Sequence, residues 1–586
     1  MTVALRPPAA LNLRPAPRWV PVASPCADRV RALHEALHLP VVVCELLAAR
    51  GFADPEAARR YLRPRLEHLS PNSSLLDCDR AVDRLVSAIR RNEVIFVHGD
   101  YDVDGMASTA LFTRVLRGLG ATRVVPWVPH RLTDGYDLSA AGVAAARAAA
   151  ATLVVTCDCG TSAHEPVAEL MAAGIDVIIT DHHLPGHGLP SAYAIVNPRR
   201  PGCLSIDKDL AAVGVAYKLA LALCEAMGAS PGLAHNQLDL VALATIADVA
   251  PLRGENRVLV RYGLRLMAET THPGLRALIR AAAMEGKPLT AGRVGFVLAP
   301  RLNAAGRIGD AKLGLALLLA ESDSEANVIA RELEELNRDR QALDQAVLSE
   351  AMRQVEATDL DHTYGLVLAN RGWHAGVIGI VASRIVEQTG RPAVLVAIDA
   401  GIGKGSGRSI PAFDLHAALG ACADCFSRYG GHRAAAGLTM LESEVPRFRE
   451  RFAEYAHTVL TADDLVPELR IDLRVPASEI GDQLEQLLRH FEPFGIGNAA
   501  PTLALDHVRL ASPPRKVGKD GVRLSIQLPT RAVDAIAWGL PTAHARLDLA
   551  TPVDIAFRLE RDDYRGANTL QLRVQSVRAA ATAHTD

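Results

Sequence analysis

The sequence predicts an α/β protein of several domains that ends in a small β-barrel. The chain has 586 residues, of which 49 % are hydrophobic and 22 % charged, so it is globular and too long for a single core. Short apolar runs alternate with helical segments from about residue 94 to about residue 460, which is typical of largely parallel sheets covered by helices. Beyond about residue 465 the helices give way to short strands separated by turns.

Composition and charge limit the possible classes of function. The formal net charge is −3, which excludes a histone-like cationic protein. If the chain binds a polyanion, local positive patches or metal ions must therefore make the contact. The nine cysteines are scattered and are expected to be free thiols in a reducing compartment. The first twenty residues are broken by prolines and lack the apolar core of an export signal. We therefore expect a cytoplasmic protein.

Residues 1–80 are predicted to form a proline-rich tail and a helical cap. Two segments there have helical spacing, ADRVRALHEAL at 27–37 and PEAARRYLRPRL at 55–66. Residues 81–320 are then predicted to form the first α/β domain. Its expected strands are VIFV (94–97), RVVPWV (123–128), TLVVT (152–156) and DVIIT (176–180). Ligands of such sheets bind beyond the carboxyl ends of the strands.

Residues 321–358 are predicted to form one long charged helix that connects two domains. Apolar residues recur there at helical spacing among many charged ones, but too few heptads are sustained for a coiled coil; they are Leu333, Leu336, Leu343, Val347 and Val355. A second α/β domain is expected over 359–462. It begins with the strand YGLVLAN (364–370) and continues with a helix, VASRIVEQTG (381–390), and a strand, PAVLVAI (392–398).

Residues 463–586 are predicted to form a small all-β barrel. The strands expected there are TLALDHVRL (502–510), RLSIQL (523–528), AVDAIAW (532–538), VDIAFRL (553–559) and LQLRVQSV (570–577).

Acidic and imidazole side chains follow several strands of the first α/β domain. They are His98, Asp100, Asp102 and Asp104 after VIFV, Asp158 after TLVVT, Asp181, His182 and His183 after DVIIT, and Asp248 at the end of LDLVALATIADV. Carboxylates brought together at one sheet edge would be forced to protonate unless divalent cations neutralised them. The pattern therefore predicts a dinuclear metal site. Mixed Asp and His ligands suit Mn²⁺ or Mg²⁺ better than a structural Zn²⁺.

Four cysteines need a separate interpretation. Cys157 and Cys159 flank Asp158, and because side chains alternate along a strand, both thiols are expected to point away from the face of the carboxylate. Cys422 and Cys425 form a CxxC pair without a second pair at metal-ligand spacing. All four are interpreted as core thiols.

In order and approximate spacing, four of these motifs resemble the DHH phosphoesterase superfamily; they are HGDYDVDG (98–105), the strand end at Asp158, DHH (181–183) and ATIADVAPL (244–252). Further segments resemble the RecJ family within it, namely VNP (196–198), RLNAAGRIGDA (301–311), GWHAGVIGIVASRI (372–385), GKGSGRS (403–409) and GGHRAAAG (430–437). The resemblance extends from about residue 30 to the barrel. It implies a DHH domain, a DHHA1-type domain and an OB-fold.

The resemblance also implies an activity. Such a chain would be a single-strand-specific 5′→3′ DNA exonuclease that releases nucleoside 5′-monophosphates with two divalent metal ions, Mn²⁺ or Mg²⁺. It would act as a monomer in recombinational repair, mismatch repair and replication-fork processing. Its partners would be single-stranded DNA with a 5′ end, a single-strand binding protein and a RecQ-like helicase.

Carried over position by position, the resemblance assigns roles to the acidic and imidazole residues. One metal would be held by His98, Asp102 and Asp158, and the other by Asp104, Asp158, His182 and Asp248. Asp158 would bridge the two ions. Asp100 and Asp181 would orient ligands or the loop. His183 would face the scissile phosphate and stabilise it or assist proton transfer, so the catalytic set is His183, Asp158 and Asp104.

Residues of three segments are implied to bind the substrate. The terminal 5′-phosphate would contact Arg131, Ser406 and Arg408, the last two in a glycine-rich segment that could approach a phosphate closely. His432, Trp373 and His374 are candidate strand contacts, although Trp373 could equally be a core aromatic. On the barrel, a turn carries Arg515, Lys516, Lys519 and Arg523, which are either phosphate contacts or a solvated loop. Trp538 and Phe557 could be stacking or core residues, so the binding face of the barrel stays open.

Two alternative functions use the same residues. A pyrophosphatase, or a phosphodiesterase acting on very short oligonucleotides or cyclic dinucleotides, would need the same metal cluster but not the long chain with its barrel. A non-catalytic replication scaffold of the same superfamily would be expected to lack ligands, whereas every ligand position is filled in this sequence.

Overall fold

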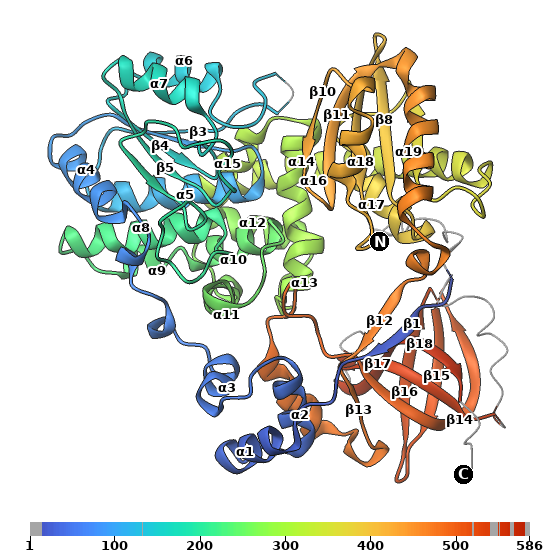
Figure 1. The fold of residues 1–586 in the computed structure, drawn as a ribbon. Coiled ribbons are helices and arrows are strands. Elements are labelled where there is room, and N and C mark those ends of the chain that lie inside the picture. Colours follow the sequence, from blue (N-terminus) through green and yellow to red (C-terminus); the bar gives the residue numbers. More distant parts are fainter. Residues whose placement is uncertain are drawn as a thin grey trace. The chain divides into compact units, whose positions relative to one another are not determined.

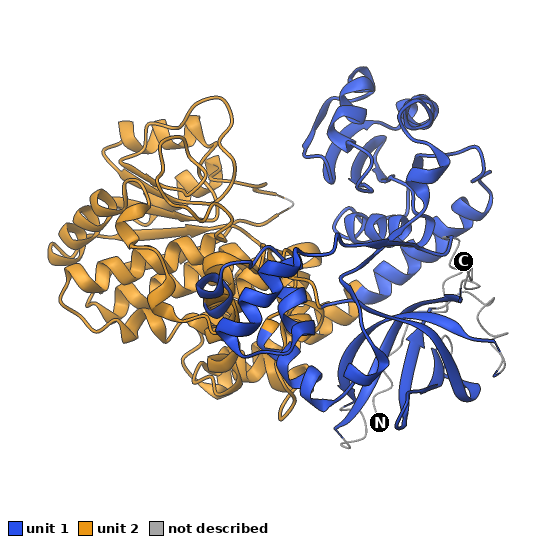
Figure 2. Cartoon of the chain, turned by 60° about the horizontal axis from the view of Figure 1, so that its bottom comes forward, with its two compact units in different colours: residues 1–59, 341–490, 501–586 blue, residues 60–340, 491–500 orange. Residues whose placement is uncertain are grey.

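The computed structural model describes residues 15–131, 133–518, 521–539, 549, 551–562 and 568–580. The chain divides into two compact units (Figure 2). One comprises residues 60–340 and 491–500, and the other comprises residues 1–59, 341–490 and 501–586. Each unit is described by itself below.

The first unit is built on a five-stranded parallel sheet with the order β3-β2-β4-β5-β6 (Figure 1). Its strands are β2 (Ile95–Gly99), β3 (Val124–Trp127), β4 (Leu153–Cys157), β5 (Asp176–Thr180) and β6 (Ala194–Val196). The four predicted strands are all present. The sequence did not reveal β6, because its three residues are too short a run to show a strand pattern.

Helices cover both faces of this sheet. Alternate residues of the strands face opposite sides, so Val97 and Val155 pack with α4, α5 and α8, whereas Phe96 and Val154 pack with α6 and α7. These helices are α4 (Cys78–Arg90), α5 (Val103–Gly118), α6 (Ala140–Ala148), α7 (His164–Ala172) and α8 (Ala212–Ala226). Both faces are therefore buried, and the strands read as continuous apolar runs.

A group of helices completes the first unit. They are η1 (Leu66–His68), η2 (Asn72–Ser74), α9 (Gly232–His235), α10 (Leu238–Ala247), α11 (Gly254–Ala268), α12 (Pro273–Ala281), α13 (Ala291–Arg293), the π-helical turn η3 (Val294–Leu298), α14 (Ala299–Ile308) and α15 (Ala311–Leu319). Helix α3 (Pro55–Leu62) spans the boundary between the two units. Helix α10 is largely apolar, and its residues from Leu238 to Thr245 are buried. Helix α3 ends before Pro64 and so is shorter than the predicted segment, because proline cannot continue the hydrogen-bonded backbone of a helix.

The long helix α16 (Asp323–Glu356) runs through 34 residues and confirms the predicted connecting helix. Leu333, Val347 and Val355 are buried, and Leu336 packs against the core of the first unit. Leu343 is the exception among the predicted apolar positions, since it is exposed. The boundary between the two units falls within α16, after Arg340.

The second unit contains a mixed five-stranded sheet with the order β10-β11-β9-β8-β7. Its strands are β7 (Leu366–Asn370), β8 (Ala393–Asp399), β9 (Ile402–Arg408), β10 (Arg428–Gly431) and β11 (Ala435–Leu441). Only β7 and β8 are parallel, and the remaining pairs are antiparallel. The accompanying helices are α17 (Ile378–Thr389), α18 (Leu415–Ala421), η4 (Ala423–Cys425), η5 (Glu442–Glu444), α19 (Val445–Val459) and η6 (Ala462–Leu465).

The glycine-rich segment GKGSGRS is a central strand, β9, and not a phosphate-binding loop. Gly403, Gly405 and Gly407 are buried on one face, and a Cβ at Gly405 would lie 2.6 Å from Leu438 Cδ1. Glycine is therefore required by packing against the neighbouring strand. The other face of β9 carries Lys404, Ser406 and Arg408.

The CxxC cysteines lie in the core of this second sheet domain, as the sequence predicted. Cys422 follows α18 directly and Cys425 lies in η4. Both thiols are buried and free.

The barrel sheet has six strands in the order β13-β14-β15-β16-β18-β17. They are β13 (Leu473–Arg474), β14 (Leu503–Val517), β15 (Gly521–Gln527), β16 (Ala532–Trp538), β17 (Val553–Asp562) and β18 (Thr569–Ala579). An additional β14–β17 pairing closes the barrel, which confirms the predicted C-terminal OB-type domain. Short helices accompany it, namely η7 (Ala477–Glu479), α20 (Asp482–Leu488) and η8 (Arg489–Phe491).

The N-terminal segment is tied to the barrel region. Strand β1 (Arg18–Pro21) pairs in parallel with β12 (Glu468–Ile471) and is followed by α1 (Ala27–Leu37) and α2 (Val41–Ala49). Trp19 Nε1 donates to Ser576 Oγ at 3.0 Å, and the Arg578 guanidinium stacks 4.2 Å from the Trp19 ring. The sequence did not predict this strand, because RWVP reads as part of the proline-rich tail.

The pairing of β1 predicts that Trp19→Ala loosens the barrel. Loss of the half-buried ring should cost about 2 kcal/mol, equivalent to roughly 30-fold faster amide exchange for strands that open with it. Hydrogen exchange followed by mass spectrometry over residues 553–580 measures this. Arg18→Ala is the control, because its ion pair with Glu468 is exposed and contributes little. Equal exchange in both variants would contradict the prediction.

Candidate metal centre

The acidic and imidazole residues are delivered by elements that end at one edge of the parallel sheet. Asp100 follows β2, Asp158 follows β4, and the Asp181–His183 segment follows β5. Because these strands are adjacent and parallel, their carboxyl ends lie side by side. Asp104 comes from the first turn of α5 and Asp248 from the C-terminal end of α10.

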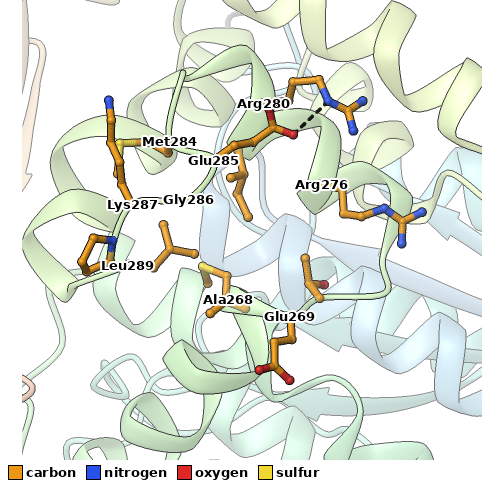
Figure 3. Close-up of a pocket in the computed structure, with 13 residues that line it drawn as sticks. Ala268, Glu269, Arg276, Arg280, Met284, Glu285, Gly286, Lys287 and Leu289 are labelled. Carbon is orange, nitrogen blue, oxygen red and sulfur yellow. Dashed lines mark hydrogen bonds and ion pairs between the residues drawn. The ribbon is translucent and has the colours of Figure 1, made fainter.

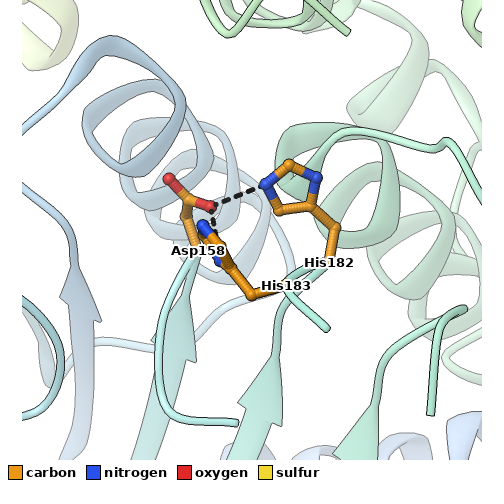
Figure 4. Close-up of side chains that lie close together, drawn as sticks. All are labelled: Asp158, His182 and His183. Atoms are coloured by element: carbon orange, nitrogen blue, oxygen red, sulfur yellow. Dashed lines mark ion pairs between the residues drawn. The ribbon is translucent and has the colours of Figure 1, made fainter. Parts of the chain in front are cut away.

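These side chains form one compact cluster. His182 Nε2 lies 3.3 Å from Asp158 Oδ1 and 3.8 Å from Asp248 Oδ2, and His183 Nδ1 lies 3.7 Å from Asp158 Oδ1 (Figure 4). In the described part of the chain, three sets have ligand atoms within 4.8 Å of one another, namely Asp158–His182–His183, Asp104–His182–Asp248 and Asp100–Asp102–Asp158. Asp158 and His182 each belong to two sets, so the sets merge into a single site.

Unpartnered polar atoms show that this cluster fits metal ions. Asp100 Oδ1, Asp158 Oδ1 and His182 Nε2 are buried without a hydrogen bond among the described residues. Leaving such atoms unpaired costs free energy. Carboxylate oxygens and a neutral imidazole nitrogen are also suitable ligands for Mn²⁺ or Mg²⁺. Two divalent cations would therefore satisfy the donor atoms that the protein leaves open.

The electrostatics of the cluster also favour the binding of divalent cations. Burial raises the pKa of Asp158 well above its usual range, and the charges of Asp104, Asp102, Asp248 and Asp100 raise it further. Burial and the neighbouring Asp102 raise the pKa of Asp104 to about 7. The carboxylates thus resist ionising together in the protein alone, and bound cations are what would keep them all charged.

Helix N-termini fix two of the carboxylates. Asp104 accepts hydrogen bonds from Ala212 N and Val213 N, both at 2.9 Å, at the start of α8. Asp102 caps α5, where its Oδ1 accepts from Asp104 N at 2.9 Å and from Gly105 N at 3.1 Å. Backbone N–H groups and the helix dipole favour negative charge at these positions. The orientation of both side chains is therefore set before any ligand binds.

Asp181 holds the DHH segment in place. Its Oδ1 accepts from His183 Nδ1 and from His182 N, both at 2.7 Å, and its Oδ2 accepts from Thr161 N at 3.0 Å. Burial alone would lower the pKa of His183, but the hydrogen bond and charge of Asp181 raise it to about 9. These contacts support an orienting role for Asp181. They also leave His183, whose side chain is 46 % exposed, as a cationic group at the mouth of the cluster.

His98 is not brought into the cluster, in contrast to the role that the family resemblance implies. It follows Phe96 on the strand face that packs against α6 and α7. Its Nδ1 lies 3.5 Å from Cys159 Sγ, and its Nε2 would lie 2.5 Å from a Cβ at Gly142 of α6. Asp100, expected only to orient ligands, instead joins Asp102 and Asp158. The geometry thus exchanges the roles of His98 and Asp100.

The two cysteines beside Asp158 lie on opposite sides of the sheet. The strand does not continue past Cys157, because Asp158 adopts a left-handed backbone with φ of 68°. Cys157 packs in the core with α5 and α8, and Cys159 contacts His98. Neither thiol joins the ligand sets in the described residues. Burial raises the pKa of Cys157 to about 12, so this thiol is unreactive.

The three residues expected to hold the 5′-phosphate fall in different units. The Arg131 guanidinium lies 4.9 Å from the ring of Tyr101, next to Asp100 of the cluster. Ser406 and Arg408 lie together on β9, where Arg408 Nη1 donates to Ser406 Oγ at 3.2 Å. A Cβ at Gly379 of α17 would lie 2.9 Å from Ser406 Oγ, so glycine makes room for this pair.

Trp373 is a core residue, and its assignment as a strand contact was wrong. The side chain is 6 % exposed, and its Nε1 donates to Glu350 Oε2 of α16 at 3.3 Å. His374 Nδ1 accepts from Gly376 N at 3.0 Å. His432 is exposed in the β10–β11 hairpin, where its Nδ1 accepts from Ala434 N at 3.2 Å. The two histidines stay candidates for strand contacts.

The basic residues of the barrel lie on strands more than on a loop. Arg515 and Lys516 belong to β14 and Arg523 to β15; Lys519 lies outside the described residues. A turn had been expected to carry these residues, but β14 continues through positions 513–514 with register shifts. Phe557 is fully buried, whereas Trp538 is 36 % exposed.

Two residues near the cluster were missed by the sequence reasoning. Tyr136 Oη lies 3.1 Å from His183 Nε2, and buried Asn197 donates to His183 O at 2.9 Å and to Thr161 Oγ1 at 3.0 Å. Asn197 lies in the VNP segment, and Tyr136 follows Arg131 by five residues. No sequence pattern marked these two polar side chains as part of the site, because only the fold brings them to the DHH segment.

A cavity of about 610 Å³ lies beside α11 and α12, apart from the cluster (Figure 3). Its cations are already engaged, since Arg276 pairs with Asp323 at 2.9 Å and Arg280 with Glu285 at 3.1 Å. None of the cluster residues lines it.

In the described residues, no helix is both long and apolar enough to span a membrane.

Comparison with known families matches three segments of the chain. The DHH family N-terminal domain matches residues 94–245, the DHHA1 domain matches residues 362–458, and the RecJ OB domain matches residues 471–576.

Curated relatives match over most of the chain. The single-stranded-DNA-specific exonuclease RecJ of Escherichia coli (strain K12) is 38 % identical, covering 92 % of this chain and 96 % of that protein. The protein of the same name from Bacillus subtilis (strain 168) is 35 % identical, covering 95 % and 70 %. The crystal structure of RecJ from Thermus thermophilus in complex with Mn²⁺ matches with a TM-score of 0.82 and 34 % identity, covering 96 % of this chain and 80 % of that one. The Mg²⁺ complex matches with a TM-score of 0.77.

The geometry predicts unequal effects of two histidine substitutions on metal binding. His182→Gln should weaken Mn²⁺ binding by at least about tenfold, because Nε2 faces two carboxylates of the cluster. His98→Gln should change it less than twofold, because this imidazole faces α6. Isothermal titration calorimetry of Mn²⁺ with both variants measures the difference. An equal loss in His98→Gln would restore His98 as a ligand.

Proposed function

The chain belongs to the RecJ family of single-stranded-DNA-specific exonucleases, and we propose that its cluster at the ends of β2, β4 and β5 holds the two divalent cations, Mn²⁺ or Mg²⁺, of a 5′→3′ exonuclease that releases nucleoside 5′-monophosphates. The observation that carries the proposal is the convergence of Asp100, Asp102, Asp104, Asp158, His182 and Asp248 with unpartnered ligand atoms. The enzyme is a phosphodiester hydrolase of the DHH superfamily.

The residues of the cluster divide the work of hydrolysis. Bound cations would supply an activated water and neutralise charge on the scissile phosphate. Asp158, which belongs to two of the ligand sets, would be shared by the two cations. His183, held by Asp181 and Tyr136, would face the phosphate and stabilise its negative charge. The helix ends that hold Asp102 and Asp104 keep these groups in position.

Recognition of the 5′ end gives the polarity. We propose that Arg131, Ser406 and Arg408 bind the terminal phosphate, so that hydrolysis removes one nucleotide at a time. Arginine is suited to this role because its guanidinium donates two parallel hydrogen bonds to a phosphate. His374 and His432 are proposed to contact the strand beyond the end.

The membership of the family supports a proposal for the cellular role. We propose that the protein acts in the cytoplasm as a monomer, in recombinational repair, mismatch repair and replication-fork processing, with a single-strand binding protein and a RecQ-like helicase as partners. The long chain with its OB domain, which a pyrophosphatase or short-oligonucleotide phosphodiesterase does not need, disfavours those alternatives. The complete acidic cluster disfavours a non-catalytic scaffold.

Hydrolysis of a 5′-phosphorylated single strand in Mn²⁺ buffer tests the proposal. Asp158→Asn should lower kcat by at least about a hundredfold, because the substitution removes the shared carboxylate while conserving volume. Quantifying mononucleotides released from 5′- and 3′-labelled strands gives rate and polarity. Asp339→Asn is the control, since Asp339 is exposed on α16. Full activity in Asp158→Asn, or turnover of pyrophosphate alone by the unmodified chain, would refute the exonuclease.

Arg131→Gln tests how the 5′ end is recognised. The variant should lose about tenfold in kcat/KM on a 5′-phosphorylated strand and little on the same strand with a 5′-hydroxyl, because only the former offers the phosphate. Steady-state kinetics on the two substrates provide the ratio. Arg123→Gln, an exposed arginine before β3, should leave the ratio unchanged. Equal losses on both ends would remove Arg131 from phosphate recognition.

A further inference from the structure

The loop after α10 holds a valine in a left-handed backbone conformation. Val249 directly follows Asp248 and has φ of 63°. In this conformation the Cβ of an L-residue crowds the carbonyl oxygen that follows it, and a β-branched residue adopts it only as an outlier. The other non-glycine residues with positive φ in the described part of the chain are alanine, aspartate, asparagine or histidine. Val249 is therefore held under strain.

The turn at the end of α10 requires this backbone conformation, but it does not require a valine. Ala250 N donates to Thr245 O at 3.2 Å, and Val249 N donates to Ile246 O at 3.2 Å. These two hydrogen bonds define a Schellman motif, in which the left-handed residue is usually glycine. Glycine would make the same turn without a Cβ. The motif thus explains the φ at position 249 and not the side chain.

Packing inside the protein does not explain the valine either. Val249 is 59 % exposed, whereas Ala250 and Leu252 of the same loop are buried. An apolar side chain that stays in water gains little from the hydrophobic effect, so its packing offsets little of the strain. Strained residues that persist in a fold cluster at positions that bind ligands.

Val249 lies beside the metal cluster. The carboxylate Oδ2 of Asp248 lies 3.8 Å from His182 Nε2, and the Cα atoms of consecutive residues are only about 3.8 Å apart. A phosphodiester is bonded through its ester oxygens to C3′ of one sugar and to C5′ of the next. An apolar side chain beside cations that hold such a phosphate therefore meets the sugars before it meets the bases.

Two further exposed apolar side chains of the first unit border the same loop. Ile496 is 55 % exposed, and its backbone oxygen accepts from Leu252 N at 2.7 Å. Phe296 is 88 % exposed and lies in the π-helical turn η3, a rare element that is frequent at functional sites. A Cβ at Gly295 would lie 3.2 Å from Ile246 Cγ2 of α10, so η3 packs against this end of the helix. A nucleoside covering this surface would lose water from any hydroxyl turned toward it.

The 2′-hydroxyl is the group that such a surface would reject. It distinguishes a ribose from a deoxyribose, and burying a hydroxyl without a hydrogen bond is unfavourable. The methyl groups of a valine offer it no hydrogen bond, whereas they pack well against the C2′ methylene of a deoxyribose. Rejection of an added hydroxyl by an apolar site reaches about a hundredfold, so one side chain can give a substantial preference for DNA.

We infer that Val249 contacts the deoxyribose next to the scissile phosphate and thereby makes the chain prefer DNA over RNA. The valine is retained at a strained position because glycine would leave the sugar without this contact. The inference rests on the proposed exonuclease function and goes beyond it by naming a residue that determines its specificity for the sugar.

Hydrolysis of two 5′-phosphorylated tetranucleotides in Mn²⁺ tests the contact. They have the same bases, but one carries ribose at its first two positions, which flank the scissile phosphate. The unmodified chain should prefer the all-deoxy strand in kcat/KM by about ten- to a hundredfold. Val249→Thr keeps the branching at Cβ but offers the ribose a hydrogen bond, so the preference should fall about fivefold.

Val249→Gly removes the contact and the strain together. The preference for the deoxy strand should fall as in Val249→Thr, while the midpoint of thermal unfolding in EDTA should rise by about 2 °C, because glycine adopts the left-handed conformation without a Cβ. The control is Val328→Thr, a change at an exposed valine of α16, which should leave the preference unchanged.

Calorimetric titration with Mn²⁺ separates a sugar contact from an effect on the position of Asp248. Both Val249 variants should bind Mn²⁺ within about twofold of the unmodified chain, because the metal ligands are intact. An unchanged preference in Val249→Thr would overturn the inference. So would a loss of Mn²⁺ binding with equal losses of activity on the two strands, or a midpoint that Val249→Gly does not raise.

Failure of the exonuclease would be distinguishable from failure of this inference. Fluorescence anisotropy of the two labelled tetranucleotides in Ca²⁺ gives Kd without any need for hydrolysis. If neither strand was hydrolysed in Mn²⁺, but the unmodified chain bound the deoxy strand more tightly and Val249→Thr lost that difference, the exonuclease would be refuted and the sugar contact would stand. Equal hydrolysis of both strands by the unmodified chain would overturn the inference and leave the exonuclease standing.

Discussion

Mutual repulsion among buried carboxylates is the constraint on which the first unit depends. Three adjacent parallel strands end at one sheet edge, and the turns that follow place Asp100, Asp158 and the DHH segment within a few ångströms of one another. Burial and neighbouring negative charges push the pKa of Asp158 far upward, so the arrangement is costly without cations. The fold offsets part of that cost locally, through the N-termini of α5 and α8, which hydrogen-bond Asp102 and Asp104. The repulsion between carboxylates that these hydrogen bonds do not offset favours the binding of divalent cations.

Much of this site could be predicted from the sequence. A carboxylate or histidine that directly follows a strand of a parallel sheet lies at the carboxyl edge of the sheet, even where the start of the strand is not known exactly. The direction in which the His98 side chain points could not be predicted in this way. It lies within β2, and only the strand's own alternation, seen through Phe96 packing against α6 and α7, shows that the imidazole faces away. Trp373 failed for a related reason: its partner Glu350 lies on the long helix, and no local pattern announces that contact.

The fold was predictable where elements are long and periodic, and not where short segments pair across the chain. Helix α1 and strands β2, β3, β4 and β5 of the first sheet follow from local apolar spacing. Strand β1 depends on residues some 450 positions away, and β9 looks like a loop because its glycines serve packing against Leu438 and not flexibility. Propensity alone cannot distinguish these cases, since the deciding contacts are tertiary.

Burial determines how the metal cluster responds to salt in a chain of net charge −3. The cluster is buried, with Asp104 and Asp158 at most 2 % exposed, so mobile ions screen it weakly. Rising ionic strength therefore leaves the electrostatics of the metal site largely intact.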